Sequence, residues 1–416
     1  MSSRAQVDVI VVGGGIVGCA SALALQQCGL TTLLIDHRVP PSWQDSQPDV
    51  KVYAIAPDNV AFFETLGVWE TIRAARVQPY RRMVVWDASA RSGLDVTATD
   101  MGTTTLGWII ESRLLIDRLW AQVHARGIRC LCPASVVALE HAGEQVRLRL
   151  DDGQRVAARL VIAADGRTSP LRSMAQIAVA TRAYGHQAIM AFVETEHPHD
   201  ATAWQRFLPT GPFAVLPWHA GQSAIVWTVP DAKAQWLMEQ DNAIFDRFQT
   251  NAFGARLGRM SLQSQRLAFP LVRQLSQRYY HERVALVGDA AHVVHPLAGQ
   301  GVNLGLRDAG GLYATVKRAR AKGIDWSSPF QLQRWERQRR VEDTVAAWTF
   351  DAIHRFYSND RVLPVLTRGA LLTAVGRFPQ LRHWLCQHAI APSNGWSSSS
   401  PSHPAQRSGW LGDVSR

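Results

Sequence analysis

The sequence predicts an α/β protein with a parallel sheet, a strand-rich insert and a helical C-terminal part. Three observations lead to this fold class. First, a buried strand, a glycine-rich turn, a helix and a second strand follow one another within residues 7–36. Second, two later strands each end beside an aspartate and a glycine. Third, residues 181–280 have the pattern of strands separated by turns. With 416 residues and 47% hydrophobic content, the chain is long enough for two or three domains.

The first strand and the turn after it have the order of a dinucleotide-binding unit. Residues 7–12, VDVIVV, form the continuous apolar run of a strand buried on both faces. Gly13 and Gly15 allow the backbone to turn tightly and approach a pyrophosphate, and Gly18 lets the following helix pack closely on the strand. Asp36 ends the next strand, where it can bind the hydroxyls of an adenosine ribose. This order predicts a Rossmann-like unit; the alternative is a glycine-rich turn that binds nothing.

Two later strands end in a similar way. Residues 159–164 lead to Asp165 and Gly166, and residues 283–288 lead to Asp289. Because ligands of open α/β sheets bind at the carboxyl ends of the strands, both carboxylates are expected near the dinucleotide. The alternative for each is a capping aspartate in a loop between a strand and a helix.

The stretch GDAAHVVHPLAGQGVNLGLRDA, residues 288–309, is rich in glycine before a helical pattern begins. Gly299 and Gly301 at the start of that helix would present backbone N–H groups and the positive end of the helix dipole to an electron-rich ring edge. A flavin has such an edge, because its N1 and C2 carbonyl collect negative charge on reduction. His292 and His295 are three residues apart with no third ligand nearby, so no metal site is expected.

These motifs together resemble the FAD-dependent aromatic hydroxylases, which have the fold of para-hydroxybenzoate hydroxylase. The third motif resembles the branch that hydroxylates ubiquinone precursors. The similarity covers nearly all of residues 5–391, and the same branch is indicated by LGVW (66–69), VQPYRRMVVWDA (77–88), LGWIIESRLL (106–115) and FLPTGPFAVLPW (207–218). The resemblance implies a Rossmann-like FAD-binding domain with a β-sheet substrate domain and C-terminal helices. It also implies FAD as cofactor, NAD(P)H as a transiently bound co-substrate, and O₂ and a polyprenylated phenol as substrates.

The resemblance also implies roles for individual residues. In that family the aspartate of the GD pair, here Asp289, binds the ribityl chain, and the GQG element faces the flavin pyrimidine. Lys51 stands where the family usually has an arginine, so a single ammonium charge replaces a planar guanidinium group. His295 and Pro296 are expected beside the ring, and no acid–base pair stands out because the flavin is the reagent. The expected cofactor contacts are Gly13, Gly15, Gly18, Asp36, Lys51, Arg113, Asp165, Gly166, Asp289, Pro296, Gly299, Gln300, Gly301 and Asn303.

The expected domains are discontinuous in the sequence. They are an FAD-binding domain (5–75, 105–180 and 281–335), a substrate-binding β domain (76–104 and 181–280), a C-terminal helical region (336–391) and a disordered tail (392–416). Several aromatic positions of the β domain either line a substrate pocket or form ordinary core; they are Phe207, Phe213, Trp218, Trp227 and residues 269–271.

The net charge of +10 is concentrated near the C-terminus, because residues 313–390 hold 13 Lys or Arg against 6 Asp or Glu. Residues 371–385 interleave apolar side chains with Arg377, Arg382 and His383, the pattern of an interfacial helix. This pattern predicts peripheral contact with the inner membrane; the alternative is packing on its own domain or on another protein of ubiquinone biosynthesis. Nucleic-acid binding is not expected, because the basic residues accompany leucines and tryptophans on helices and no reading motif is present.

The sequence predicts a cytoplasmic location. The five cysteines are odd in number and form no CxxC pair, as in proteins of reducing compartments. The apolar run near the N-terminus is too short for a signal peptide, and no stretch reaches the length of a membrane span.

The interpretation that combines these observations is an FAD-dependent monooxygenase that uses NAD(P)H and O₂ to hydroxylate the aromatic ring of a polyprenylphenol in ubiquinone biosynthesis. Two other classes remain open. One is a flavin dehydrogenase or oxidase that inserts no oxygen. The other is a non-catalytic flavoprotein scaffold in a biosynthetic complex, for which Lys51 is the supporting feature.

Overall fold

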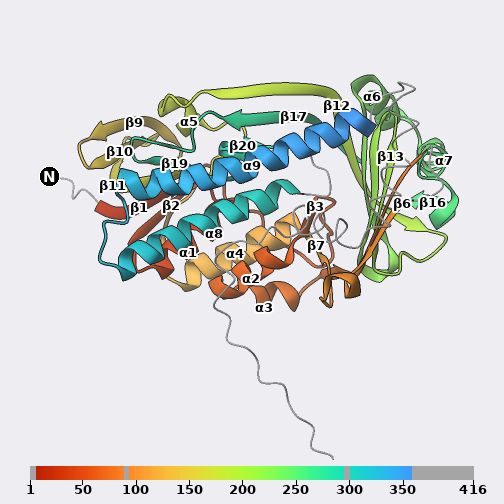
Figure 1. Cartoon of the computed structure of the whole chain (residues 1–416), viewed down its shortest axis with the longest axis horizontal. Coiled ribbons are helices and arrows are strands. Elements are labelled where there is room, and N and C mark those ends of the chain that lie inside the picture. The colour runs from red at the N-terminus through yellow and green to blue at the C-terminus, as the bar shows by residue number, and fades with distance from the viewer. Residues whose placement is uncertain (1–5, 89–92, 295–299, 358–416) are drawn as a thin grey trace, which may run out of the picture.

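The computed structural model describes residues 6–88, 93–294 and 300–357. Within these residues the strands form an eight-stranded, a nine-stranded and a three-stranded sheet. Figure 1 shows the eight-stranded sheet and its helices at one end of an elongated molecule and the nine-stranded sheet at the other. The α/β fold class is confirmed. The domain boundaries stay a prediction.

The eight-stranded sheet carries the dinucleotide-binding motif. Its order β18-β19-β11-β1-β2-β8 has five adjacent parallel strands, and a hairpin, β9 and β10, extends it beside β11. Val9, Ile10 and Val11 are fully buried, as their continuous apolar pattern predicts. The strands are β1 (Gln6–Val12), β2 (Thr32–Ile35), β8 (Arg129–Leu131), β9 (Val136–Ala142), β10 (Gln145–Leu150), β11 (Arg155–Ala163), β18 (Tyr280–His281) and β19 (Val284–Leu286).

Helices cover this sheet and connect its strands. Helix α1 packs against both α4 and α8, which come from distant parts of the chain (Figure 1). The helices of this part are α1 (Ile16–Gln27), α2 (Pro57–Leu66), α3 (Trp69–Arg73), α4 (Ser112–Ala125), α5 (Pro170–Met174) and α8 (Gln300–Ala321). Because β1, β11 and β19 are parallel neighbours, the turns after them open at one edge of the sheet.

The nine-stranded sheet is mainly antiparallel, with the order β20-β17-β12-β15-β14-β13-β5-β6 and β16 paired to β12. Its long strands β12 and β17 run back toward the first sheet (Figure 1). The strands are β5 (Arg82–Asp87), β6 (Gly93–Thr97), β12 (Val179–Thr195), β13 (Thr202–Leu208), β14 (Gly211–Pro217), β15 (Ser223–Pro230), β16 (Met260–Leu262), β17 (Leu267–Ser276) and β20 (His292–Val293). The small sheet, β3 (Val52–Ile55), β7 (Gly107–Glu111) and β4 (Val77–Tyr80), lies between the two large ones.

The two faces of the nine-stranded sheet have different partners. Phe213 and Trp227 stack with ring centroids 4.8 Å apart on the face covered by α6 (Asp231–Glu239) and α7 (Asn242–Phe253). Trp218 lies on the opposite face, which packs against the small sheet, and stacks on Phe192. These aromatic residues therefore do not line a single pocket. Phe213 and Trp227 are core residues, and we call the other face the inner face.

Helix α9 (Pro329–Tyr357) runs along the molecule beside α8 (Figure 1), and it confirms the helix expected in this region. No described helix is both long and apolar enough to span a membrane. The interfacial helix expected at residues 371–385 and the tail expected at 392–416 lie outside the described residues.

Candidate flavin site

The glycine-rich turn after β1 contains two glycines at which a side chain would collide with the backbone and one glycine beside open space. A Cβ at Gly13, whose φ is +108°, would collide with the carbonyl of Ala164, and a Cβ at Gly18 would collide with the carbonyl oxygen of Gly13. Gly15 is the N-cap of α1, and no atom lies within 4 Å of a Cβ placed there. The turn therefore holds β1, α1 and β11 close together and leaves open space at the start of the helix, where an anion can approach the free N–H groups.

Asp36 holds the glycine turn in place. Its carboxylate accepts the backbone N–H of Gly14 and, at 2.8 Å, that of Arg38. Trp120 of α4 closes the turn from the other side by donating its indole N–H to the carbonyl oxygen of Gly14 at 2.7 Å. The turn is thus fixed before any ligand binds. Sequence reasoning missed Trp120, because nothing in its local pattern links α4 to the turn.

Asp165, after β11, supports the N-terminus of the short helix α5, whose N-cap residue is Ser169. Its carboxylate accepts hydrogen bonds from the Ser169 hydroxyl at 2.5 Å and from the Leu171 N–H at 3.0 Å. Burial raises the pKa of Asp165 above its ordinary value, although these hydrogen bonds oppose the shift. The capping alternative is therefore observed, and a contact between Asp165 and the cofactor stays a prediction. Gly166 has a φ of +84° and open space at its Cβ position.

Arg172 joins the turn after β11 to the turn after β19. Its buried guanidinium donates to the carbonyl oxygens of Arg167 and Ala290, each at 2.9 Å. Two turns that are more than 100 residues apart in the sequence are thereby held together. Sequence reasoning missed Arg172, although it follows Asp165 by only seven residues.

Asp289 lies in the turn after β19. The residue is exposed to solvent, and many protein atoms surround its carboxylate. This surrounding raises the pKa of Asp289, while the nearby charges of His292, Lys51 and Arg167 lower it. Lys51 precedes β3, and its own pKa is raised first by Tyr53 and further by Asp289. Lys51 and Asp289 are 238 positions apart in the sequence, yet they lie close enough for each charge to shift the pKa of the other. Their contacts with the cofactor stay predictions.

The start of α8 meets both the glycine turn and the Asp289 turn. A Cβ at Gly305 would lie 2.7 Å from Cγ2 of Val17 in α1 and 2.9 Å from Cα of Gly288. Gly301, in the first turn of α8, has no atom within 4 Å of its Cβ position. The Cβ positions of Gly15 and Gly301 are thus both open, one at the N-cap of α1 and the other in the first turn of α8, where helix N–H groups can attract an anion.

The remaining residues that are expected to contact the cofactor lie in other surroundings. Asn303 is fully buried. Its amide N–H donates to the carbonyl oxygen of Ala54 in β3, and its amide oxygen accepts hydrogen bonds from Ala56 and Asn59 at the start of α2. The Arg113 side chain is 51% exposed, at the edge of the site. A cofactor contact by either residue stays a prediction. His295, Pro296 and Gly299 lie outside the described residues, and Gln300 begins α8.

These residues fit a dinucleotide. Two helix N-termini with open glycines, the carboxylate of Asp289 and the nearby cations Lys51 and Arg167 are gathered at one edge of a parallel sheet. Such a set provides sites for a pyrophosphate, a polyhydroxy chain and an electron-accepting ring edge. Each individual contact to the cofactor remains a prediction.

Comparison with known proteins agrees with this geometry. Residues 6–324 match the family model described as "FAD binding domain". The chain is 35% identical over 388 residues to the 3-demethoxyubiquinol 3-hydroxylase of Escherichia coli K12, covering 92% of this chain and 98% of that protein. It is 34% identical over 384 residues to the ubiquinone hydroxylase UbiL of Rhodospirillum rubrum, covering 92% of this chain and 89% of that protein.

Solved structures show the same fold. The p-nitrophenol 4-monooxygenase PnpA of Pseudomonas putida DLL-E4 superposes with a TM-score of 0.76 at 15% identity, covering 93% of this chain and 99% of that one. A single-residue variant of HpxO from Klebsiella pneumoniae, complexed with FAD, superposes with a TM-score of 0.71 at 18% identity, covering 93% and 99%. The chain belongs to the FAD-dependent monooxygenases, in the family that contains the ubiquinone-pathway hydroxylases. The cofactor and the enzyme class expected from the sequence are confirmed.

Two glycines of the same turn give a matched pair of variants. Gly15→Ala adds a methyl group where the pyrophosphate is expected, so the FAD dissociation constant should rise about tenfold or more, and the melting temperature of the apoprotein should change little. Gly18→Ala creates a backbone collision, so it should destabilise the apoprotein by about 1–3 kcal/mol. Fluorescence titration with FAD and thermal unfolding measure the two effects. Equal FAD affinity in Gly15→Ala and wild type would contradict the placement of the pyrophosphate.

Proposed function

We propose that this protein hydroxylates the aromatic ring of a polyprenylated phenol in ubiquinone biosynthesis, with NAD(P)H and O₂ as co-substrates. The observation that carries the proposal is the convergence of the turns after β1, β11 and β19 with the start of α8, beside a sheet with an apolar inner face. The relatives named above act, by their names, on ubiquinone and a ubiquinol precursor, which supports the substrate class.

The residues of the site would bind and orient the cofactor. The N-terminus of α1 at Gly15 is suited to the pyrophosphate, and Asp289 is suited to accept hydrogen bonds from the ribityl hydroxyls. The start of α8 at Gly301 would stabilise negative charge on the ring edge that faces it. When bound, FAD supplies the redox chemistry that activates O₂. Lys51 would contribute a point charge near Asp289, because its pKa is raised and its amine stays protonated.

The inner face of the nine-stranded sheet would hold the substrate side of the site. Phe192, Leu216 and Trp218 are buried between this sheet and the small sheet that begins just after Lys51. This packed apolar layer would back the substrate side of the site, help to exclude water from the reacting ring and favour an apolar aromatic substrate. The polyprenyl chain is therefore proposed to extend from this side of the molecule.

The activity is tested by adding prenylated phenols to the FAD-loaded protein under ¹⁸O₂. NAD(P)H oxidation should accelerate with the phenol, and mass spectrometry should show one ¹⁸O atom in the ring product. An oxidised product without the label would indicate a dehydrogenase or oxidase instead. FAD binding with no NAD(P)H consumption for any phenol would indicate the scaffold class. Asp289→Asn should weaken FAD binding, while the exposed Asp152→Asn serves as the control.

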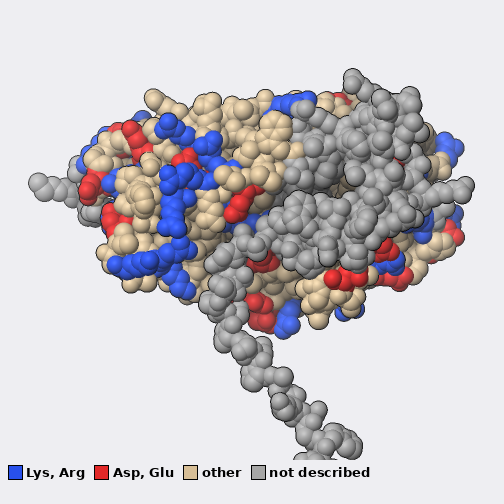
Figure 2. All heavy atoms as spheres, viewed as in Figure 1, with Lys and Arg blue, Asp and Glu red and all other residues tan. Residues whose placement is uncertain are grey.

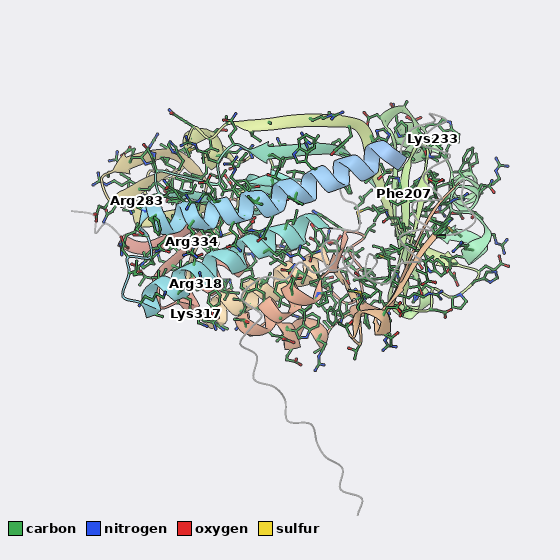
Figure 3. All side chains as sticks on the ribbon, viewed as in Figure 1. Phe207, Lys233, Arg283, Lys317, Arg318 and Arg334 are labelled. Carbon is green, nitrogen blue, oxygen red and sulfur yellow. The ribbon has the colours of Figure 1, made fainter. Side chains whose placement is uncertain are left out.

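We further propose that the protein works in the cytoplasm at the surface of the inner membrane. Exposed cations gather over the end of α8 and the beginning of α9 (Figure 2), and they include Lys317, Arg318 and Arg334, which Figure 3 labels at that end of the molecule. Ile324 and Phe330, in and next to the connecting turn, are 44% and 65% exposed. Each cation near an anionic leaflet contributes about 1 kcal/mol, so several support reversible attachment.

The membrane proposal predicts co-sedimentation with vesicles. The wild-type chain should bind vesicles that contain anionic lipid and be released by high salt, because the attraction is electrostatic. The triple variant Lys317→Glu, Arg318→Glu, Arg334→Glu should bind several-fold more weakly. Arg247→Glu, an exposed charge on α7 at the other end of the molecule, should bind like wild type. Equal binding of neutral and anionic vesicles by all variants would contradict the proposal.

A further inference from the structure

Four ionisable side chains are buried behind the Gly288–Asp289 turn. We call them the α8–α9 charge cluster: His292, Asp308, Arg339 and Asp343. His292 lies in β20 and Asp308 in α8, and the other two lie in α9. None of the four side chains is more than 3% exposed. Burial of four charged groups is costly unless they pair with one another, so their arrangement calls for an explanation.

Asp308 connects this cluster to the turn. Its Oδ2 atom accepts the backbone N–H of Gly288 at 2.9 Å and lies 2.7 Å from Nε2 of His292. Its Oδ1 atom accepts a hydrogen bond from Nε of Arg339 at 2.8 Å. The indole N–H of Trp335 in α9 donates to the backbone carbonyl of Asp308 at 3.1 Å. One carboxylate therefore holds the turn that carries Asp289 and is itself held from α9.

Asp343 of α9 contacts both Arg339 and His292. Its Oδ1 atom accepts a hydrogen bond from Arg339 at 2.7 Å, and its Oδ2 atom lies 3.4 Å from Nε2 of His292. Among the four buried side chains, two carboxylates and one guanidinium leave one negative charge uncompensated. Arg339 also pairs with the carboxylate of Glu342, but that side chain is 32% exposed and is solvated. A protonated His292 balances it, and a buried cluster without net charge is less costly than one with a net charge.

The charges around His292 agree with this balance. Burial alone would lower the pKa of His292, but Asp343 and Asp308 raise it to about 9. Burial raises the pKa of Asp343 to about 6 against the opposing effect of Arg339 and His292. The groups that face His292 are Asp308 from α8, Arg339, Glu342 and Asp343 from α9, Tyr279 before β18, and Asp289 of the same loop.

A metal ion is the other occupant to consider, because His292, Asp308 and Asp343 offer three ligand atoms within 4.8 Å of one another. Arg339 already binds both carboxylates through separate nitrogens, and it supplies the positive charge that a metal would bring. The arrangement is therefore that of an ion-pair network.

We propose that the α8–α9 charge cluster is a positioning network, which holds the Gly288–Asp289 turn in the shape that binds FAD and makes α9 part of the flavin site. Its four side chains are buried, so they would act on the cofactor through the backbone of Gly288 and not by direct contact. The inference rests on the proposed role of Asp289, and the two can fail separately.

The test compares FAD binding by wild type and His292→Gln, which keeps a hydrogen-bond donor but cannot carry a charge. At pH 7 the dissociation constant of the variant should exceed that of wild type by about tenfold, the effect of about 1.4 kcal/mol. The folded-state pKa of His292 is raised, so its contribution is fully present below about pH 6.5 and is lost as the pH rises through about 9. The ratio of the two dissociation constants should therefore approach one above pH 9.

A ratio of one at pH 7, or a ratio that does not change with pH, would overturn the inference. If His292→Gln does not fold, Asp343→Asn replaces it; this variant should move the pH at which FAD binding weakens to a lower value. Gln249→Ala, a buried residue of α7 far from the turn, is the control for a general loss of stability and should bind FAD like wild type.

Two further experiments distinguish the ion-pair network from a metal site, and a failure of the network from a failure of the proposed flavin site. Treatment with EDTA should leave FAD affinity unchanged, and a loss would show a metal ion in place of the ion-pair network. Asp289→Ala should weaken FAD binding at every pH. Normal binding by Asp289→Ala would overturn the proposed site itself, whereas weak binding by Asp289→Ala with normal binding by His292→Gln would overturn only the network.

Discussion

The flavin site depends on the close approach of backbone segments at positions where no side chain is present. Gly13 and Gly18 allow β1, α1 and β11 to meet, and Gly288 and Gly305 allow the turn after β19 to meet α1 and α8. Any Cβ at Gly18 or Gly305 would push these segments apart. Because of these contacts, two helix N-termini face the same region, and their dipoles can act on one bound molecule.

Side chains from elsewhere in the chain then fix the turns. Asp36 and Trp120 bind the two polar groups of Gly14, Arg172 binds the carbonyl of Ala290, and Asp308 binds the N–H of Gly288. Turns that must accept a ligand cannot satisfy all their backbone groups internally, so buried partners do this instead. These described turns are thereby ordered without a ligand, which reduces the entropy lost in ordering them when FAD binds.

Much of the architecture could be predicted from the sequence, because it follows local patterns. The buried strand at residues 7–12, the glycine spacing and the helix over residues 300–321 each depend on residues that are close in the sequence. The convergence of Asp289, Lys51 and the glycine turn could be expected only from the resemblance to a known family. Pairings between distant elements could not be predicted: Trp120, Arg172 and Arg339 are each ordinary residues of a helix, and only the tertiary fold brings them to a turn. The aromatic residues of β14 and β15 show the same limit, because alternation along a strand separates two faces but does not say which face lies toward the cofactor.

The central claim is that loops from three parallel strands and the start of α8 bind one FAD molecule. A crystal structure of the FAD complex tests it most directly. We expect the pyrophosphate at the N-terminus of α1 beside Gly15, the ribityl chain at Asp289 and the isoalloxazine ring at Gly301. A flavin whose pyrophosphate or ring occupied any other part of the molecule would contradict it.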